Sequence, residues 1–367
     1  MKTMDKVNVL IVGGYGLVGR EAAKLLSTNL KVNLFIGGRD IEKAIKTARE
    51  LNVNSIYIDA NDIQSIKDSI KDMDIIINCF IDITKVNVEI AKAAIKFGKK
   101  YLDIAGVPVE HLYSIIELDK VAKDNNALLI TGLGVNPGIA GLLIKKHAQY
   151  FDEVLISDIY FTLGSDFEDI SVLSLRGVGQ MINIPPKIWD NNNWIKPKQS
   201  SLKYQIGLPF NKQIYFSPAM ITPDILILPK LYNIKELRFW SGIESLMQSL
   251  VFILGIKLGY TKTDKKAEKF LRFLKSIGRN KRFHSELNLT IVSKGLHKGK
   301  AKMITNSFYC TEVLATAIAP VIVCEQIIER KYDQSGAFFP IEIVDPIAFV
   351  DRLAKSGIHY KEELIDI

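Results

Sequence analysis

The sequence predicts an α/β protein with a doubly wound parallel sheet in its first part and α+β structure in its second. Over the first 150 of the 367 residues, short apolar runs alternate with helical patterns, which is typical of βαβ units. After Pro137 the pattern changes to longer strand-like runs separated by Asn- and Pro-rich pieces, which indicates antiparallel strands. The length agrees with two domains at roughly 150 residues per domain.

The first part contains the pattern of a complete doubly wound domain, with six strands joined by five helical crossovers. The expected strands are Val7–Val12, Val32–Ile36, Ser55–Ile58, Asp74–Asn78, Lys100–Ile104 and Ala127–Thr131. The expected helices are Leu17–Ser27, Ile41–Leu51, Ile63–Lys71, Thr84–Phe97 and Val109–Asn125.

The second part begins with a helix from Pro137, placed at the first helical position, to about Tyr150. Its strand-like runs are Val154–Leu163, Gln213–Phe216 and Leu287–Ser293, and its later helices are Thr311–Arg330 and Pro346–Ser356. The Asn- and Pro-rich stretch Ile184–Lys198 is expected to be an exposed loop.

Composition excludes several classes of protein. Hydrophobic residues make up 48% and charged residues 24% of the chain, as in ordinary globular proteins. Three cysteines without a CxxC pair offer no disulfide framework, and the scattered histidines offer no zinc spacing, so we expect a cytoplasmic protein without a metal. The sequence has no run of about 18 apolar residues, so no membrane-spanning helix is predicted.

The positive charge is concentrated in one segment. Residues 257–302 carry 14 Lys or Arg and three acids, which leaves a net charge of −3 for the rest of a chain whose total is +8. A nucleic-acid binder would have a broader basic footprint and a recognised motif, so no nucleic-acid partner is expected.

A glycine-rich motif connects the first strand to the first helix. In Val9–Gly19 the glycines have the spacing Gly14-x-Gly16-x-x-Gly19. Gly14 permits a tight turn, Gly16 lets the backbone approach a pyrophosphate, and Gly19 allows close packing of helix on strand. With Tyr15, Leu17 and Val18 between them, these residues are expected to hold a dinucleotide at the helix N-terminus.

The end of the second strand favours NADP(H), with NAD(H) as the alternative. NAD-binding domains usually place Asp or Glu here, but the sequence reads Gly37-Gly38-Arg39-Asp40. The Arg39 guanidinium suits a 2′-phosphate, and Asp40 is placed to cap the following helix.

Other strand ends are expected to face the cofactor, because ligands bind at the carboxyl edge of such sheets. Asp59 and Ala60 end the third strand, where an acid can contact adenine or serve a turn. Cys79 and Phe80 end the fourth strand, where Cys79 either borders the nicotinamide or packs as a small apolar residue.

Five stretches together resemble the saccharopine dehydrogenase family: VLIVGGYGLVG, FIGGRD, DIIINCF, KKYLDIAG and TGLGVNPGIAGLL, over roughly residues 7–146. The segment 311–358 is also similar to the family's closing segment. The resemblance implies a Rossmann domain at 1–136, an inserted α+β substrate and dimerisation domain at 137–310, and a C-terminal segment at 311–367 that packs back on the Rossmann domain.

The resemblance also implies an NAD(P)-dependent oxidoreductase that forms or splits a secondary amine through an imine. Asp103 matches a position near the reactive centre, where a carboxylate can orient an amine or relay a proton, and its alternative is to cap a turn. Asn136 stands where several relatives have an acid, and it either bonds the nicotinamide amide or serves the turn.

The second part offers further candidates. Thr263–Gly278 is a basic amphipathic helix, for which the sequence favours a solvated basic face over contact with an anionic membrane surface or attraction of a carboxylate substrate. Arg176 is a candidate carboxylate clamp. Candidate proton donors are Tyr160, Tyr204, Tyr215 and His284.

The sequence thus predicts an NADP-preferring oxidoreductase that acts on an amino-acid-like imine or amine, with a small-molecule substrate and a homodimeric assembly. Two alternatives remain open. One is an enoyl or carbonyl reductase of a lipid-like substrate, and the other is an NADP-binding module that turns over no substrate.

Overall fold

The computed structural model divides into two compact units. The first comprises Met1–Ile139 and Val313–Asp345, and the second comprises Ala140–Glu312 and Pro346–Ile367. The structure describes residues 6–80, 86–105, 108–163, 172, 175–176, 179–180, 184–197, 203–204, 215–218, 221–243, 246–278 and 286–367.

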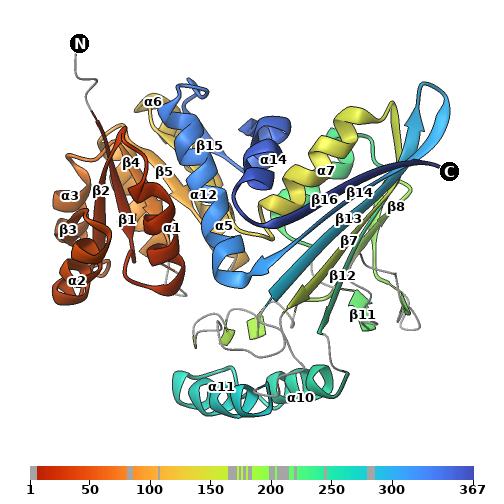
Figure 1. Ribbon diagram of the computed structural model, residues 1–367, viewed down its shortest axis with the longest axis horizontal. Helices are drawn as coiled ribbons and strands as arrows, with labels where there is room; N and C mark the ends of the chain where they lie inside the picture. The colour runs from red at the N-terminus through yellow and green to blue at the C-terminus, as the bar shows by residue number, and fades with distance from the viewer. Residues whose placement is uncertain are drawn as a thin grey trace. The chain divides into compact units, whose positions relative to one another are not determined.

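The first unit is built on a parallel sheet, as the alternating pattern predicted (Figure 1). Among the described residues its strands follow the order β15-β6-β5-β4-β1-β2-β3. Their bounds are β1 (Val7–Val12), β2 (Val32–Gly38), β3 (Asn54–Tyr57), β4 (Ile75–Asn78), β5 (Lys100–Asp103), β6 (Leu128–Thr131) and β15 (Gly336–Phe338). Every pairing in this sheet is parallel.

Helices cover this sheet because their apolar sides pack against its buried strands. They are α1 (Leu17–Ser27), α2 (Ile41–Leu51), α3 (Ile63–Ile70), α4 (Val86–Lys96), α5 (Val109–Ile116), α6 (Asp119–Asp124), α12 (Glu312–Ile328) and α13 (Pro340–Ile343). The core includes Leu10, Ile76, Tyr101 and Leu129, all fully buried. The single helix expected at Val109–Asn125 is interrupted by a tight turn in which the Leu118 N–H donates to the Ile115 carbonyl at 3.1 Å.

The seventh strand of this sheet comes from the end of the chain. β15 pairs with β6 in parallel, and Gly336 N–H donates to the Ala127 carbonyl at 2.8 Å. Figure 1 shows the late α12 and β15 among the early elements of this unit. A three-residue strand carries no periodic signal, so the sequence did not predict it.

The second unit contains a mixed sheet. Among the described residues the main path is β10-β11-β12-β7-β13-β14-β16, with β8 and β9 attached at β12. The strands are β7 (Glu153–Leu163), β8 (Ile188–Asp190), β9 (Asn193–Ile195), β10 (Lys203–Tyr204), β11 (Tyr215–Pro218), β12 (Glu236–Ile243), β13 (Glu286–His297), β14 (Lys300–Thr311) and β16 (His359–Asp366). Its helices are α7 (Ile139–Tyr150), α9 (Pro223–Leu231), α10 (Leu246–Lys257), α11 (Asp264–Gly278) and α14 (Pro346–Lys355).

The expected return of all of 311–367 to the first unit is wrong for its last part. Residues 346–367 belong to the second unit, where β16 pairs antiparallel with β14. β16 is an exposed edge strand with the polar sequence HYKEELID, so no alternation of buried and exposed side chains identified it.

The expected loop at 184–198 contains a hairpin in its described residues. Asp190 in β8 pairs with Asn193 in β9, and Trp189 pairs with Trp194. Asn191 and Asn192 form the turn with φ of 43° and 71°. Asparagine tolerates this left-handed region, so the asparagine run makes a tight turn here.

Candidate functional site

The glycine-rich turn lies between β1 and α1. Gly13 has a φ of 73°, which favours glycine, and the Gly16 N–H donates to the Gly13 carbonyl at 2.9 Å, so that Gly14 lies within the tight turn. The N–H groups of Gly13 and Gly14 donate to the Gly37 carbonyl at 2.9 and 3.1 Å. These bonds hold the turn against the end of β2.

The N-terminus of α1 is open. Gly16 is its N-cap and supplies no side chain, and Gly16 and Leu17 are exposed while Tyr15 and Val18 are half-buried. A Cβ on Gly19 would collide with the Gly13 carbonyl oxygen, so only glycine permits this close approach. The backbone N–H groups and helix dipole at this end suit a phosphate.

The end of β2 has no room for the usual acid. A Cβ on Gly38 would overlap the ring of Tyr15, whose hydroxyl accepts a hydrogen bond from the Asp40 N–H at 3.2 Å. The carboxylate of Asp40 caps α2 by accepting from the Lys43 N–H at 3.1 Å and pairs with Lys43 Nζ at 2.8 Å. Arg39, between them, is exposed.

Asp59 makes a turn after β3. Its Oδ1 accepts from the Asn61 N–H at 3.0 Å, and its own N–H donates to Ser65 Oγ at 2.9 Å. Asp59 and Ala60 are both half-buried. Of the two roles expected for Asp59, this geometry agrees with the one in a turn. Its contact with adenine stays a prediction.

Cys79 and Phe80 follow β4 and lie against the glycine-rich turn. The Cys79 N–H donates to the Val12 carbonyl at 3.0 Å, and a Cβ on Gly13 would lie 3.5 Å from the Cys79 carbonyl carbon. Both side chains are half-buried, and burial raises the pKa of the Cys79 thiol. A protonated thiol is a poor nucleophile, and the place of Cys79 beside the nicotinamide stays a prediction.

Asp103 is fully buried at the end of β5. Its Oδ1 accepts from the Ala105 N–H at 2.8 Å and from Asn78 Nδ2 at 3.4 Å, and its Oδ2 accepts from Asn87 Nδ2 at 3.5 Å. Burial raises the pKa of Asp103 to about 6, against the lowering effect of these hydrogen bonds. The carboxylate therefore shapes the turn after β5 and does not face solvent.

A polar row crosses the sheet at this level. Asn78, Asp103 and Thr131 are neighbours in the registers of β4, β5 and β6, and all three are fully buried. Tyr101 joins the row by donating its hydroxyl proton to the Asn87 carbonyl at 3.2 Å. Sequence reasoning did not select the asparagines or Tyr101, although a polar residue directly after the apolar run of β4 was an available signal.

Two buried oxygens, Oγ1 of Thr131 in this row and Oδ1 of Asn87 in α4, have no hydrogen-bond partner among the described residues. Reversing the Asn87 amide would bring its oxygen to Asp103 Oδ2, an arrangement that suits a protonated carboxyl. The raised pKa of Asp103 agrees with that arrangement.

Asn136 precedes α7 in a turn with a cis bond to Pro137. Gly134 N–H donates to the Pro137 carbonyl at 3.0 Å, and Ile139 N–H donates to the Gly134 carbonyl at 3.0 Å. Pro137 is therefore not the first helical residue, because α7 begins at Ile139. Asn136 is half-buried, and its role toward the nicotinamide stays a prediction.

The candidates of the second unit that the structure describes are engaged within the protein. Arg176 pairs with Asp264, so its guanidinium already has a carboxylate partner. Tyr160 is buried, and burial together with the charge of Asp158 raises the pKa of its hydroxyl. His284 and the side chains of Tyr204 and Tyr215 lie outside the described residues.

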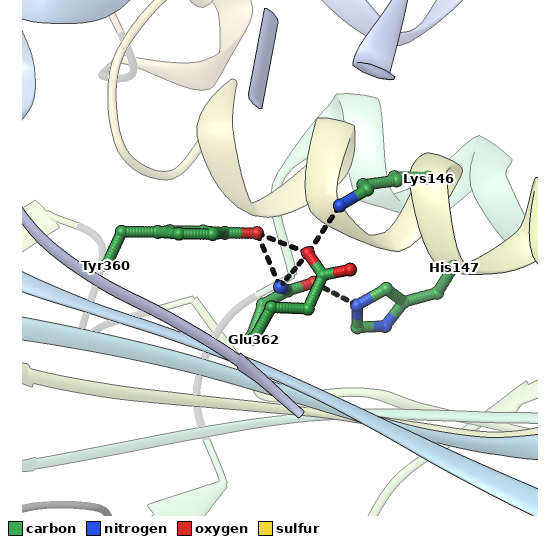
Figure 2. A network of polar contacts seen from close by, with 5 residues as sticks. Lys146, His147, Tyr360 and Glu362 are labelled. Carbon is green, nitrogen blue, oxygen red and sulfur yellow. Dashed lines mark hydrogen bonds and ion pairs between the residues drawn. The ribbon is translucent and has the colours of Figure 1, made fainter. Parts of the chain in front are cut away.

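The second unit contains a polar network between α7 and the sheet, which is buried at His147 and Asn306 and partly exposed at Lys146 and Glu362 (Figure 2). His147 Nδ1 lies 2.8 Å from Ser293 Oγ, and His147 Nε2 contacts Asn306 Oδ1. Asn306 Nδ2 donates to Tyr360 Oη at 2.6 Å and to Glu362 Oε2 at 2.8 Å. The same Glu362 oxygen accepts from Tyr360 Oη at 2.6 Å and pairs with Lys146 Nζ.

Residues 9–130 match the family model described as the saccharopine dehydrogenase NADP binding domain. This match confirms the resemblance in the first unit. No curated protein matches the chain in sequence.

Two solved structures are similar to the chain. Apo saccharopine dehydrogenase (L-Glu forming) from Saccharomyces cerevisiae has a TM-score of 0.73 at 14% identity, with 98% of this chain and 100% of that chain covered. GenD2 from gentamicin A biosynthesis, in complex with NAD, has a TM-score of 0.45 at 10% identity, with 100% and 98% covered. The likeness to the yeast protein shows a shared fold.

Among the described residues, no helix is both long enough and apolar enough to cross a bilayer.

Proposed function

With a saccharopine dehydrogenase-type NADP-binding domain at residues 9–130 as the premise, we propose that the chain is an NADP-preferring oxidoreductase. Its substrate is an amino-acid-like imine, or the corresponding secondary amine in the reverse direction. The open N-terminus of α1 beside Gly13, Gly16 and Gly19 is the observation that carries the cofactor part of this proposal.

The residues present fit a dinucleotide. The exposed turn at Gly16, together with the N–H groups of α1 that no side chain caps, offers a place for the pyrophosphate, and Gly19 lets α1 pack against the Gly13 backbone. Asp59 would lie near the adenine, and Cys79, Phe80 and Asn136 near the nicotinamide. When bound, the nicotinamide supplies or accepts the hydride.

Three neighbouring residues at the end of β2 favour NADP over NAD. Gly38 carries no acid because the Tyr15 ring lies where its side chain would be. The Asp40 carboxylate is occupied by the N–H and Nζ of Lys43, so it is a poor acceptor for a ribose hydroxyl. The exposed Arg39 guanidinium can pair with the 2′-phosphate that distinguishes NADP.

The imine substrate rests on the family resemblance. The yeast protein of similar fold is named as an L-Glu-forming saccharopine dehydrogenase. We assign Asp103 a positioning role, because its buried carboxylate bonds the Ala105 N–H and orders the turn beside the nicotinamide end of the sheet.

The test is a fluorescence titration of the purified protein with NADPH and NADH at one salt concentration, followed by a screen for NADPH oxidation. Tighter NADPH binding and oxidation that needs both an aldehyde and an amino acid support the proposal. Oxidation with an unsaturated acyl compound would favour the lipid-like alternative. Cofactor binding without hydride exchange on either panel would favour the binding module.

A further inference from the structure

Helices α10 and α11 form a pair within the second unit (Figure 1). The ring centroids of Phe252 and Phe270 are 6.4 Å apart, and those of Tyr260 and Phe270 are 5.6 Å apart. A Cβ on Gly255 would collide with the Phe270 ring, so the two helices approach closely at this glycine. α11 therefore buries its apolar side against α10.

The opposite face of α10 is apolar and exposed. Leu250 and Leu254 in α10 are each 57% exposed, and their spacing of four residues places them on one face of the helix. Leu258, which directly follows α10 and donates its N–H to the Leu254 carbonyl at 2.9 Å, continues this face and is 63% exposed. Ile253, 37% exposed, lies on the same face. We call Leu250, Ile253, Leu254 and Leu258 the leucine stripe. Adjacent exposed apolar side chains of this size mark an interaction surface.

The surroundings of the leucine stripe are basic. Residues 250–278 contain seven Lys or Arg and two acids. Both acids already have cationic partners, since Asp264 pairs with Arg176 and Glu268 with Arg272 at 3.6 Å. The cations are exposed along α11 and beside the stripe, and include Lys257, Lys262, Lys265, Lys266 and Lys269.

We propose that the leucine stripe and these lysines dock the protein on an anionic lipid surface. The stripe enters the boundary between headgroups and acyl chains, while the lysines contact the anionic headgroups. A second copy of this chain is a poor occupant, because two such surfaces would bring like charges together. α10 has 12 residues and would lie in the plane of the surface.

Vesicle flotation with the full chain tests this proposal. Vesicles of phosphatidylcholine alone are compared with vesicles that contain about 30% phosphatidylserine, at low and high salt. We expect binding to the anionic vesicles at low salt, with at least a tenfold loss at high salt. Equal binding to both vesicle types, or binding to neither, would overturn the proposal.

Two sets of variants locate the surface. Leu250→Asn with Leu254→Asn should reduce vesicle binding at least tenfold, whereas Leu30→Asn, at a leucine 86% exposed in the first unit, should not. Lys265→Gln with Lys269→Gln should reduce binding about 25-fold, at roughly fivefold per lysine, and Lys31→Gln with Lys71→Gln is the matched control.

All these positions are exposed, so circular dichroism and NADPH binding should be unchanged. If the leucine variants instead convert a dimer to a monomer and leave vesicle binding intact, the stripe is a contact between copies and the proposal is wrong. Vesicle binding does not require cofactor binding, so failure of one proposal does not affect the other.

Discussion

Lys146 and Glu362 are separated by more than 200 residues and form an ion pair that ties α7 to the last strand, β16 (Figure 2). Glu362 Oε2 also accepts from Asn306 Nδ2 and Tyr360 Oη. The hydrogen bonds from Lys146, Tyr360 and Asn306 outweigh desolvation and lower the pKa of Glu362 to about 2. The C-terminal strand is therefore held by its side chains as well as by its backbone.

Glu362→Gln should destabilise the protein by about 1 kcal/mol at pH 7, since the pair is partly exposed and screened. Glu362→Ala should cost about 2 kcal/mol, because it also removes the acceptor for Tyr360 and Asn306. A carboxylate with a lowered pKa stabilises the fold above pH 4.5 and loses this effect as the pH falls through about 2. Urea denaturation should therefore show that Glu362→Gln lowers the free energy of unfolding less at pH 3 than at pH 7. Equal effects at both pH values would contradict the ion-pair account.

His147 should make the fold sensitive to mild acid. Desolvation lowers its pKa to about 4, so between pH 6.5 and pH 4 the unfolded chain binds a proton that the folded chain does not. Stability should fall over this window as the pH is lowered, by roughly 3 kcal/mol in total. His147→Gln should flatten the slope measured by urea denaturation, and His359→Gln, at an exposed ring, is the control. An unchanged slope in His147→Gln would show that the histidine titrates normally.

Asp103→Asn should stabilise the protein above pH 6. Because the pKa of Asp103 is raised in the folded state, its carboxyl stays protonated there up to a higher pH than in the unfolded chain. The stability that this protonation contributes is lost as the pH rises through about 6. The amide substitute avoids the buried charge and still accepts from the Ala105 N–H, so a gain of the order of 2 kcal/mol is expected at pH 7.5. Asp119→Asn, the control, should destabilise the protein, because Lys123 and the Ala337 N–H lower the pKa of Asp119 despite some desolvation. Loss of stability in Asp103→Asn at pH 7.5 would contradict the assigned cost of its charge.

Arg39→Ala should reduce NADPH affinity by about 10- to 100-fold and leave NADH affinity unchanged, because a charge-assisted pair with the 2′-phosphate contributes roughly 1.5–3 kcal/mol. Arg49→Ala, at an exposed position in the last turn of α2, is the matched control. Parallel fluorescence titrations measure both affinities. An equal loss for the two cofactors would assign Arg39 to the shared part of the dinucleotide.

Gly19→Ala should abolish cofactor binding and destabilise the first unit, because its Cβ would collide with the Gly13 carbonyl oxygen. Gly16→Ala is milder, since its Cβ would lie 3.2 Å from the same oxygen on an exposed turn. We expect Gly16→Ala to weaken NADPH binding with thermal stability retained. Normal binding by Gly19→Ala in a titration would exclude the glycine-rich turn as the phosphate site.

The sequence by itself determined the first unit's strands β1 to β6, the glycine-rich turn and the capping role of Asp40. Each depends on neighbouring residues: apolar runs make buried strands, glycines at fixed spacing make the turn, and an aspartate before a helix caps it. The family-model match over residues 9–130 confirms the resemblance that those stretches indicated in this part of the chain.

Only the tertiary structure decided where the end of the chain goes, how deeply Asp103 is buried and which face of α10 is exposed. β15 and β16 pair with strands distant in the sequence, and the sequence pattern of neither strand indicates which strand it pairs with. The burial of Asp103 depends on Asn78 and Asn87, which come from two other elements. The apolar residues of α10 could have faced the core or solvent, and α11 packs against one side and leaves Leu254 on the other. These features depend on contacts between distant segments, which local periodicity does not encode.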